Sequence, residues 1–175
     1  PTLYVLDKTP NLAGNLYKKT SLSKNQRGLK KNPNNVEFLK NNVESLTTYA
    51  FGFLIEEADR LMLENYSKAK KIESEAHQYF VDAVLCGDSA ISYFHKDYFK
   101  WLAGNQEIKS ITLHNANYSN KDLELFYWTA AAYGGAVSSS GGDPKWIIKL
   151  PRIGKLLNTI VDICLLYTSP SPRDR

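Results

Sequence analysis

The chain has 175 residues, of which 43% are hydrophobic and 23% are charged, a composition typical of one globular domain with a substantial core. Its net charge of +4 is small and comes from basic residues spread along the chain, which argues against a nucleic-acid-binding protein. No run of apolar residues approaches the roughly 20 that span a bilayer, and two cysteines exclude a disulfide-rich scaffold.

Residues 1–35 are polar and are interrupted by Pro and Gly, so the sequence predicts an N-terminal polar segment with a possible helix within Leu12–Leu29. This segment carries a basic cluster made of Lys18, Lys19, Lys24, Arg27, Lys30 and Lys31. Such a cluster is able to contact an anionic surface, but few aromatic residues are interleaved with it. A solvated helix face is therefore the favoured interpretation.

From Val36 to about Glu64, apolar residues recur at steps of three and four, which predicts a long helix after an Asn34–Asn35 cap. Gly52 lies in the most apolar part of this stretch, where a helix-interior Gly costs roughly 1 kcal/mol relative to Ala. We interpret Gly52 as a site of close approach between helices, with a kink as the alternative.

A further helix is predicted to begin at Asn65 or Ser67. Its apolar stripe consists of Ala69, Ile72, Ala76, Tyr79, Phe80, Ala83 and Cys86. Gly87 is a candidate end for this helix, whereas the apolar residues within 90–94 favour its continuation.

The second half of the chain is also predicted to be helical. A short segment is expected at Tyr98–Leu102 and an irregular region at Gly104–Ser119. Ser119 or Asn120 is then expected to cap a strongly apolar helix that runs over Leu123–Val137. Because the apolar helix has almost no polar side, we expect it to be central. Asp143 followed by Pro144 predicts another helix start, and apolar residues within 147–160 predict the last helical segment.

No run of alternating apolar and polar residues is long enough to predict a strand. The sequence therefore predicts an all-α fold of antiparallel helical hairpins, with the helical-hairpin domain at 36–163. The helix pairs at 36–86 and 120–163 share a general pattern but no clean residue-level repeat, so the array is degenerate.

Titratable residues do not form a recognisable catalytic or metal-binding motif. Glu73 and His77 are one helical turn apart, but without a second His at matching spacing a surface charge pair is the favoured interpretation. The charged residues Glu56, Glu57, Asp59 and Arg60 are interpreted as a solvated helix face. Cys86 is interpreted as a buried thiol. We therefore predict no catalytic residue, metal or cofactor.

Aromatic residues gather beside Gly and Ala on the two most apolar helices, where they are Tyr49, Phe51, Phe53, Tyr127, Trp128 and Tyr133. Core packing is the simpler interpretation of this pattern. The alternative is an apolar groove or channel between helices, where Tyr and Trp keep a polar group available for a ligand.

Two stretches together resemble a known family. Tyr49–Leu54 reads YAFGFL, Leu125–Ser138 reads LFYWTAAAYGGAVS, and Asp143–Pro144 follows. This combination is similar to the TatT family, the T-component associated with TRAP transporters, over roughly Thr9–Ile160. Tyr133 stands where the family often has Trp, and Gly135 where Ala is common.

The resemblance implies degenerate tetratricopeptide-like hairpins and a non-enzymatic accessory protein. It also implies a lipid-anchored periplasmic protein, often a homotrimer, that partners the substrate-binding P-component and passes a hydrophobic or organic-acid ligand. Its candidate groove or pore lining is Tyr49, Phe51, Gly52, Phe53, Tyr127, Trp128 and Tyr133. The alternative is a generic helical-repeat adaptor that binds a peptide or partner helix and has no transport role.

The C-terminal stretch Cys164–Asp174 resembles a translated sequencing adapter, as found at the ends of assembled metagenomic proteins. We therefore predict a non-native, disordered tail at 164–175. The chain begins with Pro1 and shows no signal peptide, which is typical of a fragment of a longer exported protein.

Overall fold

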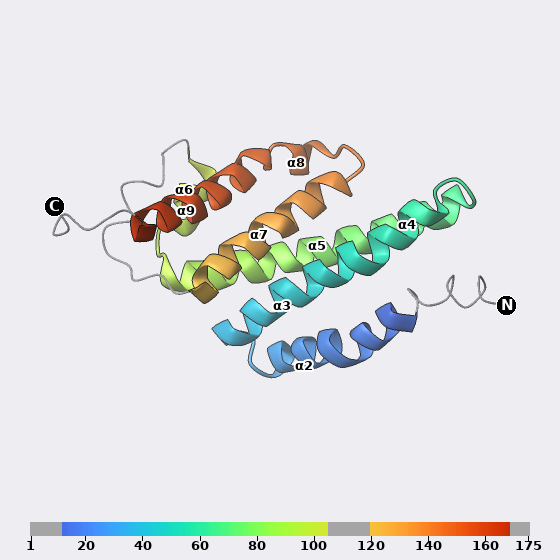
Figure 1. Ribbon diagram of the computed structural model, residues 1–175, viewed down its shortest axis with the longest axis horizontal. Helices are drawn as coiled ribbons and strands as arrows, with labels where there is room; N and C mark the ends of the chain where they lie inside the picture. The colour runs from blue at the N-terminus through green and yellow to red at the C-terminus, as the bar shows by residue number, and fades with distance from the viewer. Residues whose placement is uncertain (1–11, 105–119, 169–175) are drawn as a thin grey trace.

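The computed structural model describes residues 12–104 and 120–168, and within these ranges every regular element is a helix (Figure 1). The predicted all-α fold is therefore confirmed. The first helical rod comprises residues 12–17, the π-helical segment η1 (Lys18–Leu22) and α2 (Ser23–Lys31). It ends two residues before Pro33, which has no backbone N–H to continue a helix.

The second rod consists of α3 (Val36–Tyr49), a second π-helical segment η2 (Ala50–Ile55) and α4 (Glu56–Leu61). The Asn35 side chain caps it by accepting a hydrogen bond from the backbone N–H of Phe38 at 3.1 Å. Gly52 lies in η2, and a Cβ at this position would have no atom within 4 Å. The close helix approach predicted at Gly52 is therefore wrong, and a π-helical turn takes its place.

The third rod is α5 (Tyr66–Phe94), which passes through Gly87 without a break. It begins as predicted at Asn65, whose side chain accepts a hydrogen bond from the backbone N–H of Lys68 at 3.1 Å. The short helix α6 (Tyr98–Ala103) follows. The irregular region predicted at Gly104–Ser119 falls almost wholly outside the described residues.

The last part contains α7 (Asn120–Ser138), the single-turn helix α8 (Pro144–Ile147) and α9 (Leu150–Thr168). A turn with two glycines at positive φ precedes α8, and the Asp143 side chain caps α8 as predicted, accepting from the Lys145 N–H at 2.9 Å. Helix α9 includes residues 164–168 of the segment for which a disordered tail was expected.

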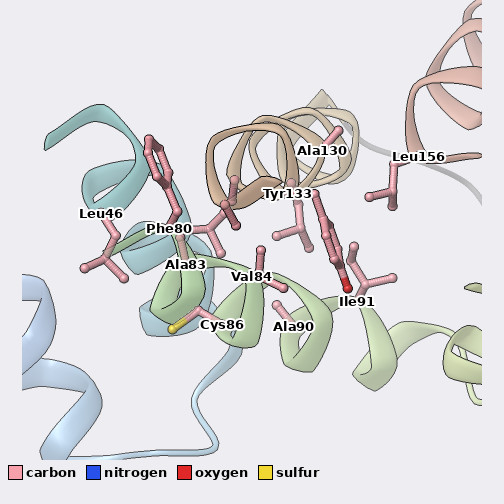
Figure 2. Packing of buried hydrophobic residues seen from close by; sticks show 14 of the residues in the cluster. Leu46, Phe80, Ala83, Val84, Cys86, Ala90, Ile91, Ala130, Tyr133 and Leu156 are labelled. Atoms are coloured by element: carbon pink, nitrogen blue, oxygen red, sulfur yellow. The ribbon is translucent and has the colours of Figure 1, made fainter. Parts of the chain in front are cut away.

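The helices pack in chain order, with α2 on α3, α3 on α5, α5 on α7 and α7 on α9. Figure 1 shows the resulting layers, from α2 at one edge to α8 and α9 at the other. Helix α7 also contacts α3, which confirms its predicted central position. Side chains from α3, α5, α7 and α9 meet in a single core, shown in Figure 2, that includes Leu46, Phe80, Tyr133 and Leu156.

Two glycines set the separation of α5 and α7. A Cβ at Gly87 would lie 2.8 Å from Thr129 Cγ2 and closer still to its Oγ1, and a Cβ at Gly135 would lie 2.6 Å from Phe80 Cζ. Neither position therefore accommodates a side chain unless the facing residue moves. Because residue 87 faces 129 while residue 80 faces 135, the two helices run antiparallel.

Candidate functional site

Four aromatic rings from the first, second and third rods lie close together. Tyr17 stacks with Tyr49 at a centroid distance of 6.4 Å, and both rings lie within 6 Å of Phe53, at 5.6 and 5.9 Å respectively. Tyr79 of α5 meets Tyr49 edge-on at 5.1 Å. These distances and tilts are those of favourable aromatic pairs. We call Tyr17, Tyr49, Phe53 and Tyr79 the aromatic cluster.

A pocket of about 190 Å³ adjoins the aromatic cluster, where the first rod, η2, α4 and α5 come together. Its lining residues are Gly14, Asn15, Tyr49, Phe53, Leu54, Glu57, Lys68 and Ile72. Gly14 packs closely against this wall, because a Cβ there would lie only 3.1 Å from the Phe53 ring. The walls are about equally polar and apolar, and Asn15, Glu57 and Lys68 supply polar groups.

Charged groups border the aromatic cluster as well. The Lys18 ammonium lies 5.5 Å from the Tyr49 ring centroid and 5.7 Å from that of Tyr79, and it pairs with Glu75 at 3.4 Å. Burial raises the pKa of the Tyr17 and Tyr49 hydroxyls, so both stay neutral at physiological pH. The site is therefore suited to holding a small, partly apolar molecule by contact and hydrogen bonding.

The structure separates the residues predicted to line a groove or pore. Of these predicted residues, only Tyr49 and Phe53 line the pocket. On the same segment, Phe51 instead packs against Phe80 at 4.5 Å, and Gly52 is exposed. Tyr17 and Tyr79 were not among the predicted lining residues.

The three candidates on α7 lie elsewhere. Tyr127 is 53% exposed and contacts half-buried Trp128 edge-on at 5.3 Å. Tyr133 is fully buried in the core. The predicted aromatic residues of the two stretches therefore do not all line one groove or pore.

A buried polar network joins four helices around Asp88 of α5. Its carboxylate accepts hydrogen bonds from the hydroxyls of Tyr98 on α6, at 2.7 Å, and Tyr133 on α7, at 2.6 Å. Arg152 of α9 donates to the Tyr133 hydroxyl at 3.0 Å. The chain of donors and acceptors thus runs from a guanidinium through a phenol to a carboxylate.

Burial raises the pKa of Asp88, opposed by its hydrogen bonds from Tyr133 and Tyr98 and by the charge of Arg152. This network was not predicted from the sequence. Asp88 follows Val84 by four residues and precedes Ile91 by three, so its place inside an apolar stripe is a signal that a buried acid needs partners.

Glu73 and His77, which were considered together from the sequence, have different partners. Glu73 pairs with Lys70, whereas His77 Nδ1 lies 3.0 Å from Ser139 Oγ. Glu57 pairs with Arg60 through two contacts of 3.0 Å. Cys86 is buried, as predicted, and burial raises the pKa of its thiol to about 11. Within residues 12–104 and 120–168, no three His, Cys, Asp or Glu residues form a group able to hold a metal.

The sequence matches the model of one protein family. The family model for the TRAP transporter T-component (TAtT) matches residues 28–169, which is most of the sequence. The chain belongs to the TRAP transporter T-component family. No curated protein and no solved structure matches the chain.

This T-component is an accessory protein of a transport system. Its family is associated with the extracytoplasmic side. The stretch LFYWTAAAYGGAVS forms most of α7, the central helix, and supplies Tyr133 to the buried network. Among the described residues, no helix has the length and apolarity needed to cross a membrane.

Proposed function

We propose that this T-component is a non-enzymatic accessory protein that partners the substrate-binding P-component of a TRAP transporter. In this role it holds a small hydrophobic molecule or organic acid in the pocket beside the aromatic cluster. It acts in the periplasm, held by a lipid anchor, and assembles as a homotrimer. Family membership supports the transport role, and the tetratricopeptide-like arrangement of its hairpins remains part of the proposal.

The observation that carries ligand binding is the lining of the pocket. Tyr49 and Phe53 provide aromatic walls, and Lys68 provides a cation that can pair with a carboxylate. A volume of about 190 Å³ suits a small molecule rather than a long lipid chain. Benzoate and hexanoate combine an apolar body with a carboxylate and are suitable probes.

The pocket is tested by filling it. Ile72→Trp places a larger side chain in the lining, and Leu85→Trp on the same helix is the matched control because Leu85 is 61% exposed and lies outside the pocket. Saturation-transfer NMR with benzoate and hexanoate is expected to show binding to the wild type and to Leu85→Trp but not to Ile72→Trp. Equal signals from both variants would place binding elsewhere.

The partnership is tested separately by mixing this protein with the substrate-binding P-component of a TRAP transporter. Co-purification and light scattering are expected to give a defined complex that contains three copies of the T-component. Failure to form a complex would contradict the partnership and favour a helical-repeat adaptor without a transport role. Ligand binding to the pocket would still be decided by the NMR experiment.

A further inference from the structure

Positive charge is concentrated on the first helical rod. Residues 12–31 contain six Lys and Arg residues and no Asp or Glu. The neighbouring rod, residues 36–61, has five Asp and Glu residues against two Lys and Arg. The net charge of the whole chain is only +4, so the overall composition does not reveal this separation of positive and negative charge between the two rods.

Five of the six cations face solvent. Lys18 turns inward to the aromatic cluster and Glu75, whereas the other five are exposed, namely Lys19, Lys24, Arg27, Lys30 and Lys31. In the part of the chain that the structure describes, none of these five forms an ion pair with a carboxylate. They form what we call the basic face.

A shallow, open depression lies along the middle of the basic face. This depression of about 430 Å³ is lined by Lys19, Ser23, Gln26, Arg27 and Lys30. Between Lys19 and Lys31 the row extends for about 18 Å, given the rise per residue of a helix. A surface of this length matches a layer of anionic groups better than it matches one small ion.

Two exposed leucines belong to the same rod. Leu12 is 67% exposed and Leu16 is 64% exposed, one helical turn apart and next to the basic face. Figure 1 shows the rod at the edge of the molecule, on the outer side of α3. Exposed leucines beside a row of Lys and Arg are typical of helices that lie at a membrane surface.

We infer that the basic face binds the headgroups of anionic phospholipids, with Leu12 and Leu16 inserted into the apolar boundary of the same membrane. The cations gain attraction to the negative lipid surface, and the leucines leave water. An acidic protein surface would satisfy the cations but would leave both leucines exposed. The lipid surface therefore accounts for both features of the rod.

Vesicle co-sedimentation tests the inference, with phosphatidylcholine vesicles with and without phosphatidylglycerol. The wild type is expected to bind only the anionic vesicles, and more weakly as salt is raised. The variant Lys19→Gln/Arg27→Gln/Lys30→Gln is expected to bind about 100-fold more weakly, because each basic residue near an anionic surface contributes about one kcal/mol.

The control variant Lys96→Gln/Lys100→Gln/Lys145→Gln removes the same charge from exposed lysines outside the first rod. It is expected to bind nearly as well as the wild type, and circular dichroism checks that both variants stay helical. Equal losses in the two variants would show a general charge effect and overturn the inference, as would absence of wild-type binding.

Leu12→Ser/Leu16→Ser separates a lipid surface from an acidic macromolecule. This variant is expected to bind anionic vesicles several-fold more weakly and to bind polyglutamate as the wild type does, because only a membrane accepts the leucines. Unchanged vesicle binding, together with equally tight binding of the wild type to polyglutamate, would assign the basic face to an acidic protein partner instead.

Discussion

Gly87 of α5 lies directly against Thr129 of α7, so closely that a Cβ at residue 87 would be 2.8 Å from Thr129 Cγ2. The Thr129 side chain is fully buried and its hydroxyl donates to the Leu125 carbonyl at 2.7 Å. Thr129 therefore cannot rotate away without losing a buried hydrogen bond. This contact fixes how closely the two central helices approach.

Gly87→Ala is expected to lower the free energy of unfolding by about 1–3 kcal/mol, because the added methyl group overpacks the interface. Gly134→Ala is the matched control, since a Cβ at Gly134 meets nothing within 4 Å and Ala is the better helix former by up to about 1 kcal/mol. Urea denaturation followed by circular dichroism measures both variants. A Gly87 variant as stable as the Gly134 variant would contradict the close packing.

Tyr133→Phe is expected to destabilise the protein by about 1–3 kcal/mol, because Asp88 loses one donor and Arg152 loses its acceptor in a buried site. Tyr127→Phe provides the control, since the Tyr127 side chain is half exposed. The measurement is the free energy of unfolding in urea at neutral pH. Equal stabilities of the two variants would show that the network contributes nothing.

The Asp88 carboxyl is expected to make stability depend on pH. Its pKa is raised in the folded protein, mainly by burial, above the ordinary value of 3.8. As pH rises, Asp88 therefore ionises in the unfolded chain before it ionises in the folded protein. The free energy of unfolding falls as pH rises from about 3.8 through the raised pKa. The contribution of Asp88 to stability is fully present only below that range.

Asp88→Asn removes this titration. Urea denaturation at a series of pH values from 3.5 to 8 is expected to show the wild type losing stability relative to Asp88→Asn as pH rises, with other carboxyls cancelling in the comparison. Lys149 and Arg152 act on the same carboxyl and oppose the effect of burial. A relative gain in stability with rising pH would mean that their charges dominate and that the pKa is lowered.

Asn65→Ala is expected to cost about 1 kcal/mol, because the Lys68 N–H in the first turn of α5 loses its side-chain acceptor. Asn65→Asp keeps an acceptor at the same place and is expected to be close to neutral. Thermal unfolding distinguishes the two variants. A loss of the same size in both would indicate that the amide group has another role.

Local chemistry made the helix boundaries predictable. Asn35, Asn65 and Asp143 cap the helices that follow them, and each lies within three residues of the N–H that it accepts from. Gly52 was misinterpreted because a glycine in a helix has several explanations, and only the packing of other helices distinguishes them.

Long-range partners were not predictable from one sequence. Asp88 and Tyr133 are 45 residues apart and belong to different helices. The aromatic stretches show the same limit, because Tyr49 is 5% exposed and Tyr127 is 53% exposed although both follow the same kind of local pattern. Residue type and spacing identify an apolar helix but not which of its neighbours leaves a pocket open.

The π-helical turn at Ala50–Ile55 sets the phase between the two halves of the second rod. One extra residue in a helix rotates everything that follows by about 100°. Ala58 and Leu61 reach their buried positions through this offset. Removal of one residue here would close the wide turn into an ordinary α-helical turn and leave the acidic residues of the rod on the face that they now occupy. The second rod therefore carries one residue more than a continuous α-helix would need, and the buried face of α3 still continues into α4.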